Sequence, residues 1–165
     1  MFEQRSLAKS LLLYLFAVVL TIMNLTNINI SGFNDVMPMM DLMAVFYFAV
    51  FKNIFGLFFI FLLGIWNDAL NGNPLGLTSL CYIVLIKFFA ILNVRLLNKE
   101  RFRQIWQQFI YFSIMFLFGK WFLLLIINGQ SGSVWNLIVQ LIISSVLYIP
   151  AHSLFDYLNR KLLGQ

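Results

Sequence analysis

The sequence has little of what a water-soluble catalytic domain needs. Only 10% of its 165 residues are charged, and it contains one cysteine, Cys81, and one histidine, His152. A single cysteine excludes an internal disulfide and a thiolate metal cluster, so we expect Cys81 to face lipid or fill the core. A single histidine leaves no metal-ligand set and no triad partners, so we expect His152 to be structural. Because G-x-S-x-G, P-loop, H-E-x-x-H and dinucleotide-binding motifs are also missing, we expect neither an enzyme nor a bound cofactor.

Apolar residues, by contrast, are abundant. They make up 62% of the chain, and the mean hydropathy of +0.90 is far above that of a soluble domain. Nineteen phenylalanines, four tryptophans and six tyrosines exceed what the core of one small soluble domain can hold. Aromatic side chains are suited to lipid contact and to the belts at membrane interfaces. The composition therefore predicts an all-α integral membrane protein.

Six apolar stretches are candidate transmembrane helices. A bilayer core about 30 Å thick needs about 20 residues per helix. The stretches cover residues 7–25, 36–51, 54–70, 75–92, 105–127 and 134–154, which makes residues 1–165 a single six-helix transmembrane domain. Only Lys52 and Asn53 separate the short second and third stretches, so these predict a tight helical hairpin. No small-residue cleavage site follows the first stretch, which is therefore expected to be retained rather than removed as a signal peptide.

Basic residues gather in alternate loops between these stretches. Nine of the eleven basic residues lie before the first stretch, between the second and third stretches, between the fourth and fifth stretches, or after the sixth stretch. These nine residues are Arg5, Lys9, Lys52, Arg95, Lys99, Arg101, Arg103, Arg160 and Lys161. The other three loops contain none. The positive-inside rule then predicts that both termini are cytoplasmic. Attraction to anionic lipid at that face accounts for the net charge of +5, so no nucleic-acid partner is expected.

Ionisable side chains inside the predicted helices are candidates for function, because each costs about 2.5–3.5 kcal/mol at a helix centre. Lys87 lies in the cytoplasmic half of the fourth stretch, where its long stem can reach the inner headgroups. Lys120 and Asp41 lie at similar depths below the outer surface. Three interpretations of Lys120 stay open: an ion pair with Asp41, alone or shared with Asp68; independent extension to the surface; or a ligand site.

The segment from Gly64 to Gly76, GIWNDALNGNPLG, closes the third stretch and opens the fourth. Gly72 tolerates positive φ and Pro74 presets φ in the first turn of the next helix, which predicts a tight outer turn. Asp68, one turn earlier, can accept hydrogen bonds from the free N–H groups at the start of that helix. We interpret Asp68 as a hairpin clamp, with contact to a partner protein as the alternative. Gly72 and Gly76 match G-x-x-x-G, but the intervening proline and loop argue against a dimer motif.

These residues resemble a known family. The pattern Asp-x-x-x-Gly-x-Pro-Leu-Gly, in a small six-helix protein with a basic loop between the fourth and fifth stretches, is similar to the MreD family of bacterial rod shape-determining proteins. Here the pattern consists of Asp68, Gly72, Pro74, Leu75 and Gly76. The resemblance covers essentially the whole chain. It implies a non-enzymatic inner-membrane component of the complex that builds the lateral peptidoglycan wall, beside MreC, the MreB filament and a transglycosylase and transpeptidase pair.

The same resemblance supplies an alternative. The family is similar in fold to the substrate-binding subunits of energy-coupling factor vitamin transporters. Such a subunit needs an outward-facing pocket with a few placed polar groups. The side chains that can line one are Asp41, Asp68, Lys120, Trp66 and Trp121. It also needs small residues on the first helix to dock a partner subunit, but Ala8 and Ala17 form no close repeat. The sequence therefore favours the wall-synthesis component.

Overall fold

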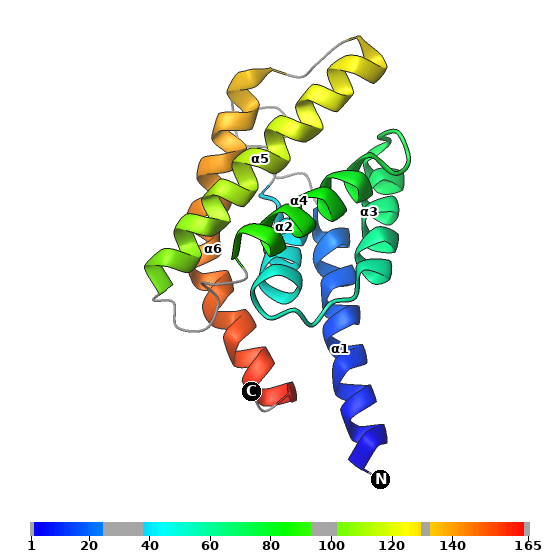
Figure 1. Ribbon diagram of the computed structural model, residues 1–165, viewed down its shortest axis with the longest axis vertical. Coiled ribbons are helices and arrows are strands. Elements are labelled where there is room, and N and C mark those ends of the chain that lie inside the picture. Colours follow the sequence, from blue (N-terminus) through cyan, green and yellow to red (C-terminus); the bar gives the residue numbers. More distant parts are fainter. Residues whose placement is uncertain (1, 25–37, 94–101, 130–132, 164–165) are drawn as a thin grey trace.

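The protein is built from helices (Figure 1). A computed structural model describes residues 2–24, 38–93, 102–129 and 133–163, and no residue in these ranges belongs to a strand. The prediction of an all-α protein with six helices is confirmed. The elements are α1 (Phe2–Met23), α2 (Met40–Val45), the π-helical segment η1 (Phe46–Phe51), α3 (Leu57–Asn71), α4 (Leu77–Asn93), α5 (Phe102–Asn128) and α6 (Val134–Leu163).

The helices differ in length more than the sequence predicts. Among the described residues, two stretches are long and apolar enough to cross a membrane: Phe102–Ile127 with 26 residues and Val134–Leu162 with 29. At 1.5 Å per residue each exceeds the roughly 30 Å of a bilayer core. The shorter apolar stretches are Leu11–Met23, Met40–Phe51, Leu57–Asn71 and Leu77–Leu92. The described residues therefore contain two long candidate spans and four shorter apolar helices.

The second predicted helix departs furthest from expectation. Instead of one span over 36–51, α2 begins at Met40 and passes into η1 at Phe46, while residues 36–37 lie outside the described ranges. Every residue from Asp41 to Val50 is buried, because α1, α4, α5 and α6 pack around this central element. A helix that is apolar on all sides is stable only when it is surrounded. The twelve residues of Met40–Phe51 reach about 18 Å and form the buried core of the bundle.

The predicted hairpin between the second and third helices is wrong. The main partner of α3 is α4, and α1 contacts both α2 and α3 (Figure 1). The cause of the tight α3–α4 pairing is Gly64. A Cβ atom there would lie 2.6 Å from the backbone N and Cα of Ser79, so only glycine permits this approach. Across the same contact the Ser79 hydroxyl donates to the Phe61 carbonyl at 2.7 Å.

The last helix extends beyond its predicted end at residue 154. It continues through Pro150 to Leu163, although proline cannot donate the N–H of the helical ladder. Contacts beyond the proline hold this extension. Buried Phe155 packs against the rings of Phe16, Tyr47 and Phe48. As a result the Leu163 end of α6 lies at the same end of the bundle as the Phe2 end of α1 (Figure 1).

Candidate functional site

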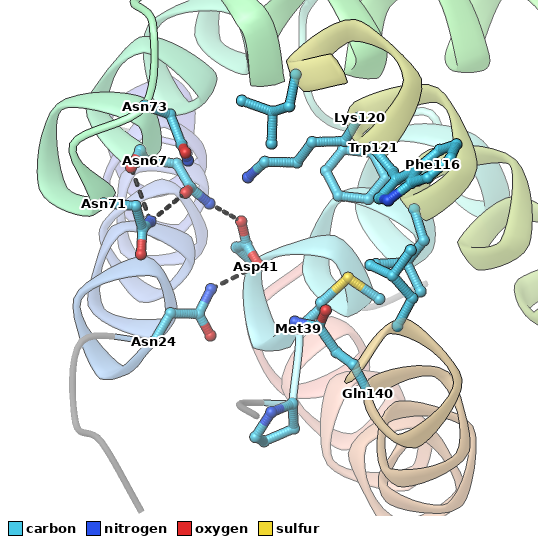
Figure 2. A pocket seen from close by; sticks show the side chains of 14 residues that line it. Asn24, Met39, Asp41, Asn67, Asn71, Asn73, Phe116, Lys120, Trp121 and Gln140 are labelled. Atoms are coloured by element: carbon cyan, nitrogen blue, oxygen red, sulfur yellow. Dashed lines mark hydrogen bonds between the residues drawn. The ribbon is translucent and has the colours of Figure 1, made fainter. Parts of the chain in front are cut away.

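Asp41 is the centre of a buried polar network. It is the second residue of α2 and only 3% exposed. Its carboxyl group accepts hydrogen bonds from Asn24 Nδ2 at 2.6 Å and from Asn67 Nδ2 (Figure 2). It also accepts a hydrogen bond from the Tyr82 hydroxyl. These donors come from the end of α1, from α3 and from α4. One acidic side chain therefore joins three helices to the central element, and neutral donors satisfy it.

The partners of Asp41 are themselves held in place. Asn24 Oδ1 accepts from the backbone N–H of Met40 at 3.2 Å. Asn71 Nδ2 donates to Asn67 Oδ1 at 2.6 Å and to the Asn67 carbonyl at 2.8 Å, which leaves the Asn67 amide nitrogen to face Asp41 (Figure 2). Because each amide has a second bond, its orientation is fixed before anything else binds. The network is a preorganised polar surface.

A cavity of about 360 Å³ lies beside this network (Figure 2). Its polar lining comes from the end of α1, the start of α2, the end of α3 and the upper parts of α5 and α6. Its apolar lining comes mainly from α5. The lining residues are Asn24, Pro38, Met39, Asp41, Asn67, Asn71, Asn73, Phe116, Leu117, Lys120, Trp121, Leu124, Leu137 and Gln140. The volume falls in the range of small-molecule sites, about 300–1,000 Å³.

Lys120 points into this cavity, and no acidic side chain of the described residues bonds to it (Figure 2). Among the described residues no carboxylate lies within 4.0 Å of its Nζ atom, since the one ion pair there joins Arg160 to Asp156. The contact with Asp41 or Asp68 that the sequence left open is therefore not made. The ammonium group does lie over the Phe116 ring, 6.0 Å from its centroid. Lys87, in comparison, is exposed on α4.

Asp68 makes the local bonds that the sequence predicts. Its Oδ2 accepts from the Thr78 backbone N–H at 2.9 Å, and its Oδ1 accepts from the Thr78 hydroxyl. Asp68 is fully buried and does not line the cavity. Gly72 ends α3 with φ of 65°, and Gly76 has φ of 93°. Pro74 precedes α4, which begins at Leu77 and not at residue 75.

The cavity and the sequence-based site overlap only in part. Asp41, Lys120 and Trp121 line it, as proposed for an outward-facing pocket. Trp66 is 49% exposed and lies outside the lining. Sequence reasoning missed the four asparagines and Tyr82. The sequence pointed to the asparagines only by their concentration near the predicted outer ends of helices. Asn24 follows α1, Asn67 and Asn71 lie in α3, and Asn73 lies in the following turn.

A second polar cluster lies at the opposite end of the central element. The Tyr47 hydroxyl donates to Asp156 Oδ1 at 2.8 Å, and Arg160 Nη2 donates to Asp156 Oδ2 at 2.6 Å. His152 packs beside it against aromatic rings, including those of Tyr47 and Tyr148. The described residues contain no group of three His, Cys, Asp or Glu side chains that could hold a metal ion. This cluster links η1 to α6, and His152 has the structural surroundings expected for it.

Comparison with known proteins gives one match. No curated protein and no solved structure matches the chain significantly. The family model described as "rod shape-determining protein MreD" matches residues 4–158, which is nearly the whole chain. The apolar helices agree with this match, because both point to a multi-pass membrane protein. The chain belongs to the MreD family of rod shape-determining proteins.

Proposed function

We propose that this chain is a non-enzymatic component of the rod complex in the bacterial inner membrane, where it promotes lateral peptidoglycan synthesis by binding partner membrane proteins. The family match over residues 4–158 carries the proposal, since membership implies a role in determining rod shape. The partners expected from the family are MreC and, through the complex, MreB and the wall-synthesising transglycosylase and transpeptidase. Contact with MreC is the step that this chain would make directly.

The proposed mechanism is binding alone. A protein that has no reacting groups can place its partners, or shift one of them between states by binding one state more tightly. Large apolar side chains on the outer surface of the two longest helices support this mechanism, because they suit lipid or a neighbouring apolar helix. They include Tyr111, Phe118 and Ile126 on α5 and Trp135, Ile142 and Val146 on α6, each more than half exposed.

The proposed orientation has both termini in the cytoplasm. The loop between η1 and α3, the start of α5 and the end of α6 lie toward the same end of the bundle as the Phe2 end of α1 (Figure 1). The basic residues Lys52, Arg103, Arg160 and Lys161 belong to these segments. The positive-inside rule assigns that end to the cytoplasm. On this assignment Asn24 and Asn71, which line the cavity at the ends of α1 and α3, lie toward the outer face.

The test of partner binding is capture of MreC from native membranes. The chain carries an affinity tag at its cytoplasmic C-terminus, the membranes are treated with a short cross-linker, and the complexes are solubilised and identified by mass spectrometry. An equally abundant multi-pass protein with the same tag is the control. We expect MreC to be enriched only with this chain. Failure to enrich MreC, while the chain is folded and inserted, would contradict the proposal.

The energy-coupling factor transporter subunit is kept as a second candidate because the cavity provides the pocket that such a subunit needs. The two candidates differ in the phenotype of a depleted cell. Loss of a transporter subunit produces a vitamin requirement with normal cell shape. Loss of the rod-complex component changes the shape whether or not vitamins are supplied.

A further inference from the structure

The cavity has features that partner binding does not explain. It holds about 360 Å³ and is lined by side chains of α1, α2, α3, α5 and α6 and of the turn after α3. Polar side chains gather on the side of α1 and α3, whereas the α5 side carries Phe116, Leu117 and Leu124 beside Lys120 and Trp121. Partner binding through apolar outer surfaces does not require a polar hollow inside the bundle, where each polar group withdrawn from water must be satisfied. This division into a polar and an apolar wall is typical of a small-molecule site.

The position of Lys120 indicates that one end of the ligand is negatively charged. Its side chain extends from α5 across the cavity toward Asn67 and Asn73 (Figure 2). It does not pair with a carboxylate of the described residues, and its position is only partly exposed. An ammonium group held in this way is stabilised strongly by an anion that enters the cavity. Carboxylate and phosphate are the anions that a lysine binds as a point charge.

The position of Asp41 indicates that the other end of the ligand is a hydrogen-bond donor. Its carboxyl group has about four acceptor sites, of which three are used by Asn24, Asn67 and Tyr82. Asp41 also lines the cavity, and a negative ligand group placed beside its carboxyl group would be repelled. A hydroxyl or ammonium group, which can donate a hydrogen bond, would be attracted. The charges of Lys120 and Asp41 therefore select opposite ends of one molecule.

We propose that the cavity binds a small amphoteric molecule in which an anionic phosphate or carboxylate is separated by a few bonds from an ammonium or hydroxyl donor. Lys120 binds the anion, Asp41 accepts from the donor, and the amides of Asn71 and Asn73 bond the atoms between. This chemistry occurs in soluble metabolites and in the ethanolamine headgroup of a phospholipid. The site lies outside the partner-binding role proposed above, so either can fail without the other.

The test measures binding of O-phosphoethanolamine and of phosphatidylethanolamine to the full chain. For the soluble arm, the chain is placed in phosphatidylcholine nanodiscs and titrated with radiolabelled O-phosphoethanolamine. For the lipid arm, native mass spectrometry compares phosphatidylethanolamine with phosphatidylcholine on the chain in detergent. Two control compounds each lack one half of the proposed recognition. Phosphatidylcholine keeps the phosphate, but its choline headgroup has no N–H donor. Free ethanolamine keeps the ammonium donor but has no anion.

The matched variants are Lys120→Gln and Lys87→Gln. Both remove one lysine charge from a helix, but Lys87 lies outside the cavity lining. We expect saturable binding with Kd below about 1 mM, weakened at least about tenfold by Lys120→Gln and unchanged by Lys87→Gln. Lys120→Arg keeps the charge and should retain most of the binding, which separates lost recognition from lost folding.

Each outcome decides the matter. Saturation by O-phosphoethanolamine assigns the site to a soluble molecule, and selective retention of phosphatidylethanolamine alone assigns it to a headgroup. No saturable binding in either arm would overturn the proposal. Equal binding by the wild type and Lys120→Gln, or equal binding of choline and ethanolamine headgroups, would overturn it as well.

Discussion

Replacing Gly64 with alanine should force α3 and α4 apart. The added Cβ would lie 2.6 Å from Ser79 N and Cα, about 0.8 Å closer than the 3.4 Å at which ordinary contact begins. Overpacking costs about 1–3 kcal/mol, and the upper end applies here because a helix backbone cannot rotate away. Alanine recovers about 1 kcal/mol of helix propensity. The net loss in the free energy of unfolding is therefore about 2 kcal/mol.

Gly119→Ala is the matched control for this change. Gly119 also lies inside a helix, but a Cβ there meets no atom within 4 Å, so the substitution should stabilise the protein by up to about 1 kcal/mol. Thermal unfolding of the detergent-solubilised chain, followed by tryptophan fluorescence, gives the comparison. We expect the midpoint to fall by about 4–8 °C for Gly64→Ala and to stay or rise for Gly119→Ala. A Gly64→Ala protein that melts at or above the wild-type midpoint would refute the close packing of α3 on α4.

Three further substitutions test the polar contacts. Asp41→Asn replaces one acceptor oxygen by a donor, so at least one buried hydrogen bond is lost and the free energy of unfolding should fall by about 2 kcal/mol. An unchanged midpoint of thermal unfolding would contradict the network. Asp68→Ala leaves the Thr78 N–H and hydroxyl without their acceptor, so the free energy of unfolding should fall by about 2–4 kcal/mol. Amide hydrogen exchange at the start of α4 should become faster, and exchange as slow as in the wild type would argue against the clamp. Tyr47→Phe removes the bond to Asp156 and should cost about 1–2 kcal/mol by thermal unfolding, while a cost near zero would mean that the bond adds nothing.

Helices could be predicted from the sequence where the local pattern of apolar and turn residues determines them. Long apolar stretches identified α5 and α6, and the turn residues Gly72 and Pro74 marked the connection between α3 and α4. Asp68 was also accessible to prediction, since its partner Thr78 is only ten residues away across that turn. Contacts of this kind depend on capping and turn chemistry, which neighbouring residues set.

The central element and the cavity could not be predicted in the same way. A buried twelve-residue helix and a transmembrane helix are both apolar all round, so hydropathy cannot separate them. The partners of Asp41 lie 17, 26 and 41 residues away, and no periodicity links Asn24, Asn67 and Tyr82 to it. The direction of Lys120 likewise depends on the rotation of α5 in the bundle. These features follow from tertiary packing, which the order of residues does not display.

Depletion of this chain in its native bacterium, with imaging of the cell outline and of labelled new wall, tests the central claim most directly. A role in the rod complex predicts that cells round or swell and that new wall is dispersed rather than inserted along the side, while the wild-type gene restores rods. Cells that keep their rod shape and lateral insertion after the protein has disappeared would contradict it.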